Sequence, residues 1–94
     1  PNRRPTHPGV LLREDIIPAL GIPKAEIARL LMISRQQLYD ILLEKKSVSP
    51  NVAARLGKLF GNGTAFWVSM QAAYDTWMAD HDVDVSQIET LEMA

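Results

Sequence analysis

The most constraining feature of this 94-residue sequence is the spacing of its apolar residues, which recur every three or four positions along most of the chain. This period is that of an α-helix with one buried face. No segment alternates apolar and polar residues convincingly, as a half-buried strand would. Serine or proline precedes most of the periodic segments, and glycine follows two of them. The sequence therefore predicts an all-α fold.

Five helices follow from this pattern. We expect them to begin near Pro8, Pro23, Ser34, Ser49 and Thr64, with Ser34, Ser49 and Thr64 as N-caps. Pro18 and Gly21 are expected to end the first helix, and the fifth, at about residues 65–80, is the longest. A weak helical turn is expected at 87–91.

The charges are divided between two halves of the chain, although the net charge is only −1. Residues 1–58 hold all ten basic residues and five acidic ones, which gives +5. Residues 59–94 hold six acidic residues and no basic residue, which gives −6. This asymmetry indicates separate partners for the two halves.

The composition argues against several classes of protein. There is no cysteine for a disulfide or a thiolate zinc site, and the acidic run at 80–84 has no defined metal geometry. No Ser-His-Asp arrangement, glycine-rich phosphate loop or HExxH motif is present, so we expect no cofactor, no metal and no enzymatic activity. No apolar run approaches the ~20 residues that span a bilayer. We expect one small, soluble, cytoplasmic domain that a dimer interface would help to stabilise.

The helices predicted within residues 24–43 have the spacing of a helix-turn-helix. Ala28 is the small residue that such a unit needs where its helices cross, and Ile33 fills the turn between them. Leu38 and Ile41 would pack the second helix onto the first. In a helix-turn-helix, this second helix enters the major groove of DNA.

The exposed side of the second helix carries groups that suit this groove. Gln36 and Gln37 can pair with adenine, and Arg35 with guanine or phosphate. Ser34 and the first N–H groups of the helix can bind a phosphate, and the basic Arg3–Arg4 arm can contribute. A merely solvated helix face would carry similar residues, but the turn spacing and the +5 half favour DNA binding.

Several motifs resemble those of the HigA antitoxins, helix-turn-helix proteins of the lambda-repressor-like (XRE) group. His7-Pro8-Gly9 and the run from Phe66 to Asp75 are fairly specific to that branch, whereas Leu20-Gly21, Ser49-Pro50 and Gly61 are shared more widely. The resemblance covers about residues 6–77 and implies a five-helix lambda-repressor-like DNA-binding domain at 1–80 with an acidic C-terminal extension at 81–94. His7 is expected to cap the first helix or to contact a neighbouring side chain.

The resemblance also implies a function. A HigA-type protein is a homodimer that binds palindromic double-stranded operator DNA, represses its own operon and binds a HigB-type ribonuclease toxin. The DNA contacts carried over to this sequence are Ser34, Arg35, Gln36, Gln37, Tyr39, Lys45 and Lys46. Two alternatives are a stand-alone XRE-family regulator without a toxin partner and a protein-interaction module that has lost DNA binding.

Three positions depart from the usual pattern of this group. Met32 and Glu44 stand where glycine is common, and the glycine at the turn relieves strain in a left-handed conformation. Asp40 replaces a DNA-compatible residue on the second helix. Its carboxylate would repel phosphates, although an aspartate can accept a hydrogen bond from cytosine N4.

Large apolar side chains recur along the predicted fifth helix. Phe66, Trp67 and Met70 are expected to close the core of the bundle. Tyr74, Trp77 and Met78 lie further along, where the shorter helices would leave them uncovered, and they are candidates for a dimer interface. Simple packing within one chain is the alternative for these three residues.

Overall fold

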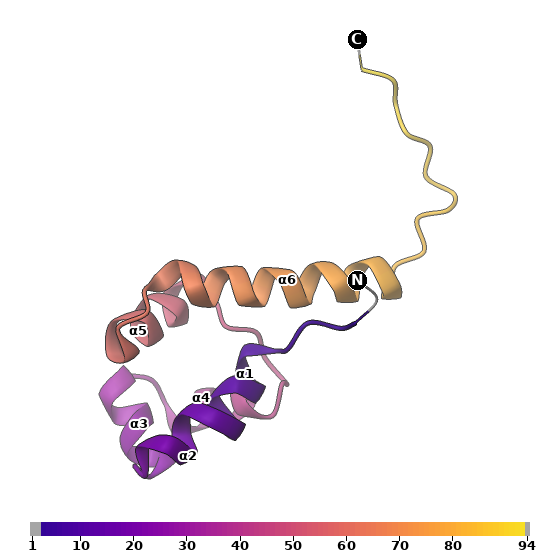
Figure 1. Ribbon diagram of the computed structural model, residues 1–94. Coiled ribbons are helices and arrows are strands. Elements are labelled where there is room, and N and C mark those ends of the chain that lie inside the picture. Colours follow the sequence, from indigo (N-terminus) through magenta and orange to yellow (C-terminus); the bar gives the residue numbers. More distant parts are fainter. Residues whose placement is uncertain (1–2, 94) are drawn as a thin grey trace.

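The computed structural model describes residues 3–93, and within this range the chain folds into five helices without a strand (Figure 1). The first helix consists of three consecutive pieces, α1 (Pro8–Leu11), the π-helical turn η1 (Leu12–Ile16) and α2 (Ile17–Leu20). The others are α3 (Lys24–Leu31), α4 (Arg35–Leu42), α5 (Pro50–Phe60) and α6 (Thr64–Asp82). The predicted all-α, five-helix fold is confirmed.

The first helix continues to Leu20, so the prediction that Pro18 helps to end it is wrong. In a regular α-helix, proline lacks the N–H that would bond, and its ring collides with the carbonyl four residues earlier. Here a wider turn precedes the proline, because the Ile17 N–H bonds to the carbonyl of Leu12, five residues back. Gly21 then ends the helix at φ 66°.

Two helix ends place a large side chain in the left-handed conformation. Met32 follows α3 at φ 61° and Glu44 follows α4 at φ 62°, and both stand where glycine was noted as the common residue. At α3 the Ile33 N–H bonds back to the Ala28 carbonyl at 3.1 Å, which closes the helix. A non-glycine residue in this conformation costs about 1–2 kcal/mol. Arg55 of α5 stabilises the same end, because its Nη1 donates to the Leu31 carbonyl at 3.1 Å.

The core lies among all five helices. Its buried apolar members are Leu12, Ile17, Ile27, Ala28, Leu31, Leu38, Ile41, Leu42, Val48, Val52, Ala53, Leu56 and Trp67. Trp67 is fully buried, as predicted, and its Nε1 donates to Asn62 Oδ1 at 2.8 Å. Met70 is half-buried. Phe66 is 44% exposed, so its predicted place in the core is wrong. It lies about 100° around the helix from Trp67 and packs edge-on against that ring from outside.

The start of α6 packs closely on α5. A Cβ on Gly57 would overlap the backbone of Gly63 and Thr64, so only glycine permits this approach. Gly63 occupies the N-cap position and Thr64 is the first helical residue, which makes the predicted Thr64 cap wrong. Packing against Gly57 fixes this end of the helix without a side-chain cap.

The chain leaves α6 after Asp82 and extends away from the helices (Figure 1). Residues 83–93 form no helix, so the helical turn expected at 87–91 is wrong. Asp84 Oδ1 accepts the Ser86 N–H at 2.9 Å, and Ile88 and Leu91 are 71% and 82% exposed, with no core to cover them. Within residues 3–93, no group of three His, Asp or Glu side chains could hold a metal ion. Among the helices of residues 3–93, none combines the length and the apolar character that a membrane span requires.

Candidate nucleic-acid interface

The packing of α4 on the core directs its polar side outward. Ser34 is in an extended conformation before the helix, and its Oγ accepts the Gln37 N–H at 3.0 Å, which confirms the predicted cap. Leu38 and Ile41 are each 1% exposed and hold the helix on the core. Gln36 and Gln37 are exposed on the other side of the helix.

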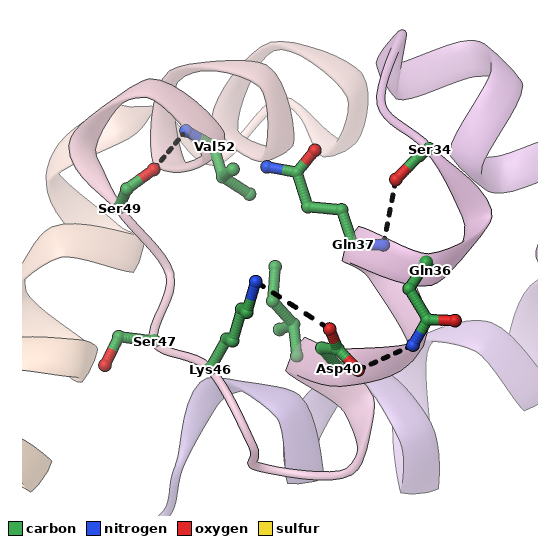
Figure 2. A pocket seen from close by; sticks show the side chains of 9 residues that line it. Ser34, Gln36, Gln37, Asp40, Lys46, Ser47, Ser49 and Val52 are labelled. Carbon is green, nitrogen blue, oxygen red and sulfur yellow. Dashed lines mark hydrogen bonds and ion pairs between the residues drawn. The ribbon is translucent and has the colours of Figure 1, made fainter.

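A hollow of about 430 Å³ opens beside α4, the loop that follows it and the start of α5 (Figure 2). Its lining consists of Ser34, Gln36, Gln37, Asp40, Ile41, Lys46, Ser47, Ser49 and Val52. The N-termini of both helices border it, and Ser49 Oγ caps the second by accepting the Val52 N–H at 3.2 Å. Two helix N-termini and a lysine are groups that bind the anionic backbone of a nucleic acid.

A polar cluster lies within this hollow. Gln36 Nε2 donates to Asp40 Oδ1 at 2.8 Å, and Lys46 Nζ lies 3.9 Å from Asp40 Oδ2 (Figure 2). From the sequence, Asp40 is only a departure from the usual pattern, and this pairing was not predicted. The spacing of glutamine and aspartate by four residues was the available signal, because such side chains meet on a helix surface.

The predicted DNA-contact residues do not all lie together. Ser34, Gln36, Gln37 and Lys46 line the hollow. Arg35 lies towards α3, beside Glu26 and Arg29. Tyr39 lies on another side of α4, beside Arg13 and Lys24. Lys45 is exposed in the loop after α4. The structure thus concentrates four of the seven side chains at one place and spreads three around it.

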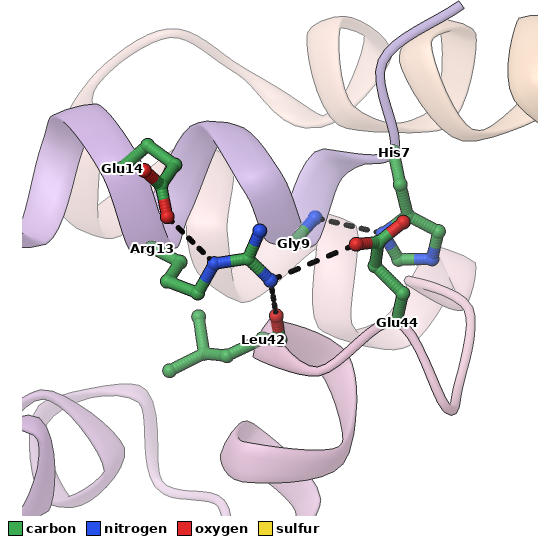
Figure 3. Close-up of polar contacts among 6 residues, drawn as sticks. All are labelled: His7, Gly9, Arg13, Glu14, Leu42 and Glu44. Carbon is green, nitrogen blue, oxygen red and sulfur yellow. Dashed lines mark hydrogen bonds and ion pairs between the residues drawn. The ribbon is translucent and has the colours of Figure 1, made fainter. Parts of the chain in front are cut away.

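Arg13 of the first helix fixes the end of α4 (Figure 3). Its Nη1 donates to the Leu42 carbonyl at 2.6 Å and lies 3.6 Å from Glu44 Oε2, while its Nε pairs with Glu14 at 2.8 Å. The carbonyls at the end of a helix have no partner within the helix. Arg13 supplies a partner for one of these carbonyls, that of Leu42. It also holds the side chain of Glu44, whose backbone is left-handed.

His7 joins the first helix to α6. Its Nδ1 accepts the Gly9 N–H at 2.9 Å and caps α1 (Figure 3), and its ring packs edge-on against Tyr74 at 4.9 Å between ring centroids. Both predicted roles of this histidine, cap and neighbour contact, are confirmed. Burial lowers the pKa of His7 below 6.5, and the carboxylates of Glu44 and Asp75 oppose part of this shift.

This lowered pKa predicts a loss of stability in mild acid. The unfolded state, with an ordinary pKa of 6.5, binds more protons than the folded state near pH 6. The free energy of unfolding should therefore fall as the pH drops below 6.5. Urea unfolding at pH 8 and pH 5.5 measures this loss. His7→Asn keeps a capping acceptor but does not titrate. In this variant, the free energy of unfolding should differ less between the two pH values than it does in the wild type. An equal difference in both proteins would contradict the assignment.

Gln71 ties α6 to the loop beside the hollow, a contact that the sequence analysis did not predict. This side chain is 5% exposed, and its Oε1 accepts the Val48 N–H at 2.8 Å. Its Nε2 donates to Asp75 Oδ1 at 2.9 Å. The loop that carries Lys46 and Ser47 is therefore held at two points. Gln71 of α6 binds the Val48 N–H, and the Asp40 carbonyl of α4 binds the Lys46 N–H.

Comparison with known proteins places this architecture in a family. The chain is 34% identical over 76 residues to virulence-associated protein I of Dichelobacter nodosus, which covers 81% of this chain and 70% of that protein. It superposes on an addiction module antidote protein of the HigA family from Coxiella burnetii with a TM-score of 0.82, 30% identity and coverage of 96% of this chain and 100% of that one. The chain belongs to the HigA family of antitoxins.

A second HigA structure was solved together with a promoter. The antitoxin HigA of Pseudomonas aeruginosa, solved with the higBA promoter, matches this HigA-family chain with a TM-score of 0.75 and 32% identity. The match covers 86% of this chain and 97% of that protein. The sequence matches no family model. The resemblance noted from the motifs of this sequence is thus confirmed by relatives that cover most of the chain.

Proposed function

We propose that this HigA-family chain is an antitoxin that binds operator DNA with α4, represses its own operon and has no catalytic activity. One observation carries the proposal, namely the hollow that gathers Ser34, Gln36, Gln37 and Lys46 at the N-termini of two helices. A related HigA was solved with its promoter, which supports the same use of this fold. Arg35, Tyr39 and Lys45 would contact DNA on either side of the hollow.

We propose that the operator is bound by a homodimer, in which the two α4 helices occupy successive major grooves about 34 Å apart. Tyr74, Trp77 and Met78 of α6 are the proposed interface. All three are half-buried in the single chain, so part of each side chain is open to solvent. A second copy would cover these side chains.

The acidic half supports a second partner. All six charges of residues 59–94 are negative, so this half favours a basic protein over DNA. We propose that it contacts a HigB-type toxin and that the chain divides into the DNA-binding domain 1–80 and the extension 81–94. Residues 1, 2 and 94 of that division lie outside the described range.

A gel shift on the gene's own promoter tests DNA binding. The protein should retard the duplex in a salt-sensitive manner, because contacts to phosphate release counterions. Gln37→Ala should weaken binding by roughly 1–3 kcal/mol through its base pair. No retardation at low salt would refute the operator proposal and leave an interaction module.

The adjacent gene separates an antitoxin from a stand-alone regulator. If the proposal holds, the neighbouring reading frame encodes a small basic protein that co-purifies with this chain. Replacing Asp80, Asp82 and Asp84 together by asparagine should weaken that complex and leave operator affinity unchanged or slightly higher, because these acids would repel phosphates. A gene that stands alone would favour the regulator.

A further inference from the structure

The outermost ridge of α4 carries an aspartate, which is an unusual residue to present to DNA. Leu38 and Ile41 define the buried side of the helix, and Gln36 and Asp40 lie four residues apart on the opposite side. The Asp40 side chain is nevertheless only 14% exposed, because Gln36 and Lys46 flank its two carboxylate oxygens. The acid is held within a cluster and does not stand free in the groove-facing surface.

Lys46 offsets the charge that would otherwise repel the nucleic acid. Its Nζ lies 3.9 Å from Asp40 Oδ2, and the backbone N–H of the same residue bonds to the Asp40 carbonyl at 3.2 Å. The loop therefore keeps the ammonium group close to the carboxylate. With this pair neutralised locally, the ridge can approach the base edges without a net negative charge.

The hydrogen bond between Gln36 and Asp40 also orients the glutamine amide. An ionised carboxylate can only accept, so it must face the NH₂ group of Gln36 and not its carbonyl oxygen. The NH₂ group has two hydrogens, and Asp40 takes one of them. Within the described residues this amide forms no other hydrogen bond, so its second N–H and its carbonyl oxygen are left to pair with a base. This donor and acceptor, side by side, match N7 and N6 of adenine in the major groove.

We infer that Asp40 is a positioning residue for sequence readout: it fixes the Gln36 amide so that Gln36 recognises the adenine of an A·T pair in the operator. This inference rests on the proposed DNA binding and adds which side chain reads a base, which base it reads and what orients it. Lys46 then has two roles, since it neutralises Asp40 and contributes positive charge beside the phosphates.

The experiment first selects a preferred duplex from a randomised library with the wild-type protein. Gln36→Ala identifies the base pair that Gln36 reads, as the position where the preference for A·T over G·C is lost. The wild-type preference there should be roughly 5- to 150-fold. Asp40→Ala should reduce it to the level of Gln36→Ala, and the double variant should discriminate no worse than either single one.

Asp40→Asn is the matched control, because its Oδ1 still accepts from Gln36 while the charge is removed. It should keep most of the preference at that base pair and bind all duplexes somewhat more tightly, since the negative charge is gone. If Asp40 mattered only for folding, Asp40→Ala and Asp40→Asn would have the same effect on the base preference. Thermal unfolding of each variant checks that the fold survives, a control that Asp40 requires because its side chain is only 14% exposed.

Two results would overturn the inference. Full retention of the preference at the Gln36 base pair in Asp40→Ala would show that Gln36 needs no support. A changed preference at a different base pair in Asp40→Ala would show that Asp40 reads a base itself, as an acceptor for cytosine N4. Failure of the proposed function is distinguishable, because the wild-type protein would then select no duplex at all.

Discussion

Gly9→Ala should destabilise the protein by about 3 kcal/mol or more, the upper end of what overpacking costs. A Cβ at this position would overlap the Ile41 carbonyl of α4 and press on the ring of His7. The carbonyl belongs to the helix backbone and cannot move as a flexible side chain can. Alanine for glycine within a helix usually stabilises by about 0.5–1 kcal/mol, so the expected sign is the opposite of the ordinary one.

Thermal unfolding measures this effect directly. For a domain of this size, 3 kcal/mol corresponds to a decrease of about 12–24 °C in Tm. Asp15→Ala, at an exposed position on the same helix, is the control and should change stability by less than about 0.5 kcal/mol. A Tm for Gly9→Ala equal to or above that of the wild type would mean that the first helix and α4 are further apart than described.

Replacing both Lys45 and Lys46 by glutamate should reduce operator affinity about a thousandfold at 0.1 M salt. In the proposed dimer these two lysines would make four phosphate contacts, and each would contribute about 0.9 to the slope of log affinity against log salt. Asp40 also loses its counter-charge at 3.9 Å, which adds repulsion. Fluorescence anisotropy with a labelled promoter duplex at several salt concentrations gives both the affinity and the slope.

Lys58→Glu is the control for charge alone. Lys58 lies on α5 beside Leu30 and Leu59, outside the hollow. Its replacement changes the net charge as much as the single variant Lys46→Glu, which is measured beside the double variant. It should weaken binding only a few-fold. If it weakens binding as much as Lys46→Glu, the loop lysine makes no specific contact and only the overall charge of the chain matters.

Local chemistry made much of the fold predictable. Serine caps act through the N–H groups two or three residues ahead, so Ser34 and Ser49 could be assigned from the sequence. The glycine that is common at the turn pointed to a left-handed position at Met32, which the structure has at φ 61°, whereas the left-handed conformation of Glu44 was not predicted. The period of the apolar residues determined which face of α4 is buried.

Features that depend on contacts between distant segments were not predictable in this way. The π-turn before Pro18 depends on the bond from the Ile17 N–H to the Leu12 carbonyl, which no spacing in the sequence indicates. Phe66 lies outside because Trp67 occupies the inward position. Asp40 was judged as a free charge, whereas its effect depends on the conformation of the loop that brings Lys46 to it. Gln71 acts on a loop 23 residues away, a distance over which a sequence pattern gives no signal.

Titration of ¹⁵N-labelled protein with its promoter duplex, followed by NMR, tests most directly whether the hollow beside α4 is the DNA-binding surface. The backbone amides of residues 34–37 and 46–49 and the side-chain amides of Gln36 and Gln37 should show the largest chemical-shift changes. The amides of residues 83–93 should remain unchanged. Changes concentrated in α6 or the acidic extension, with residues 34–37 unaffected, would contradict this account.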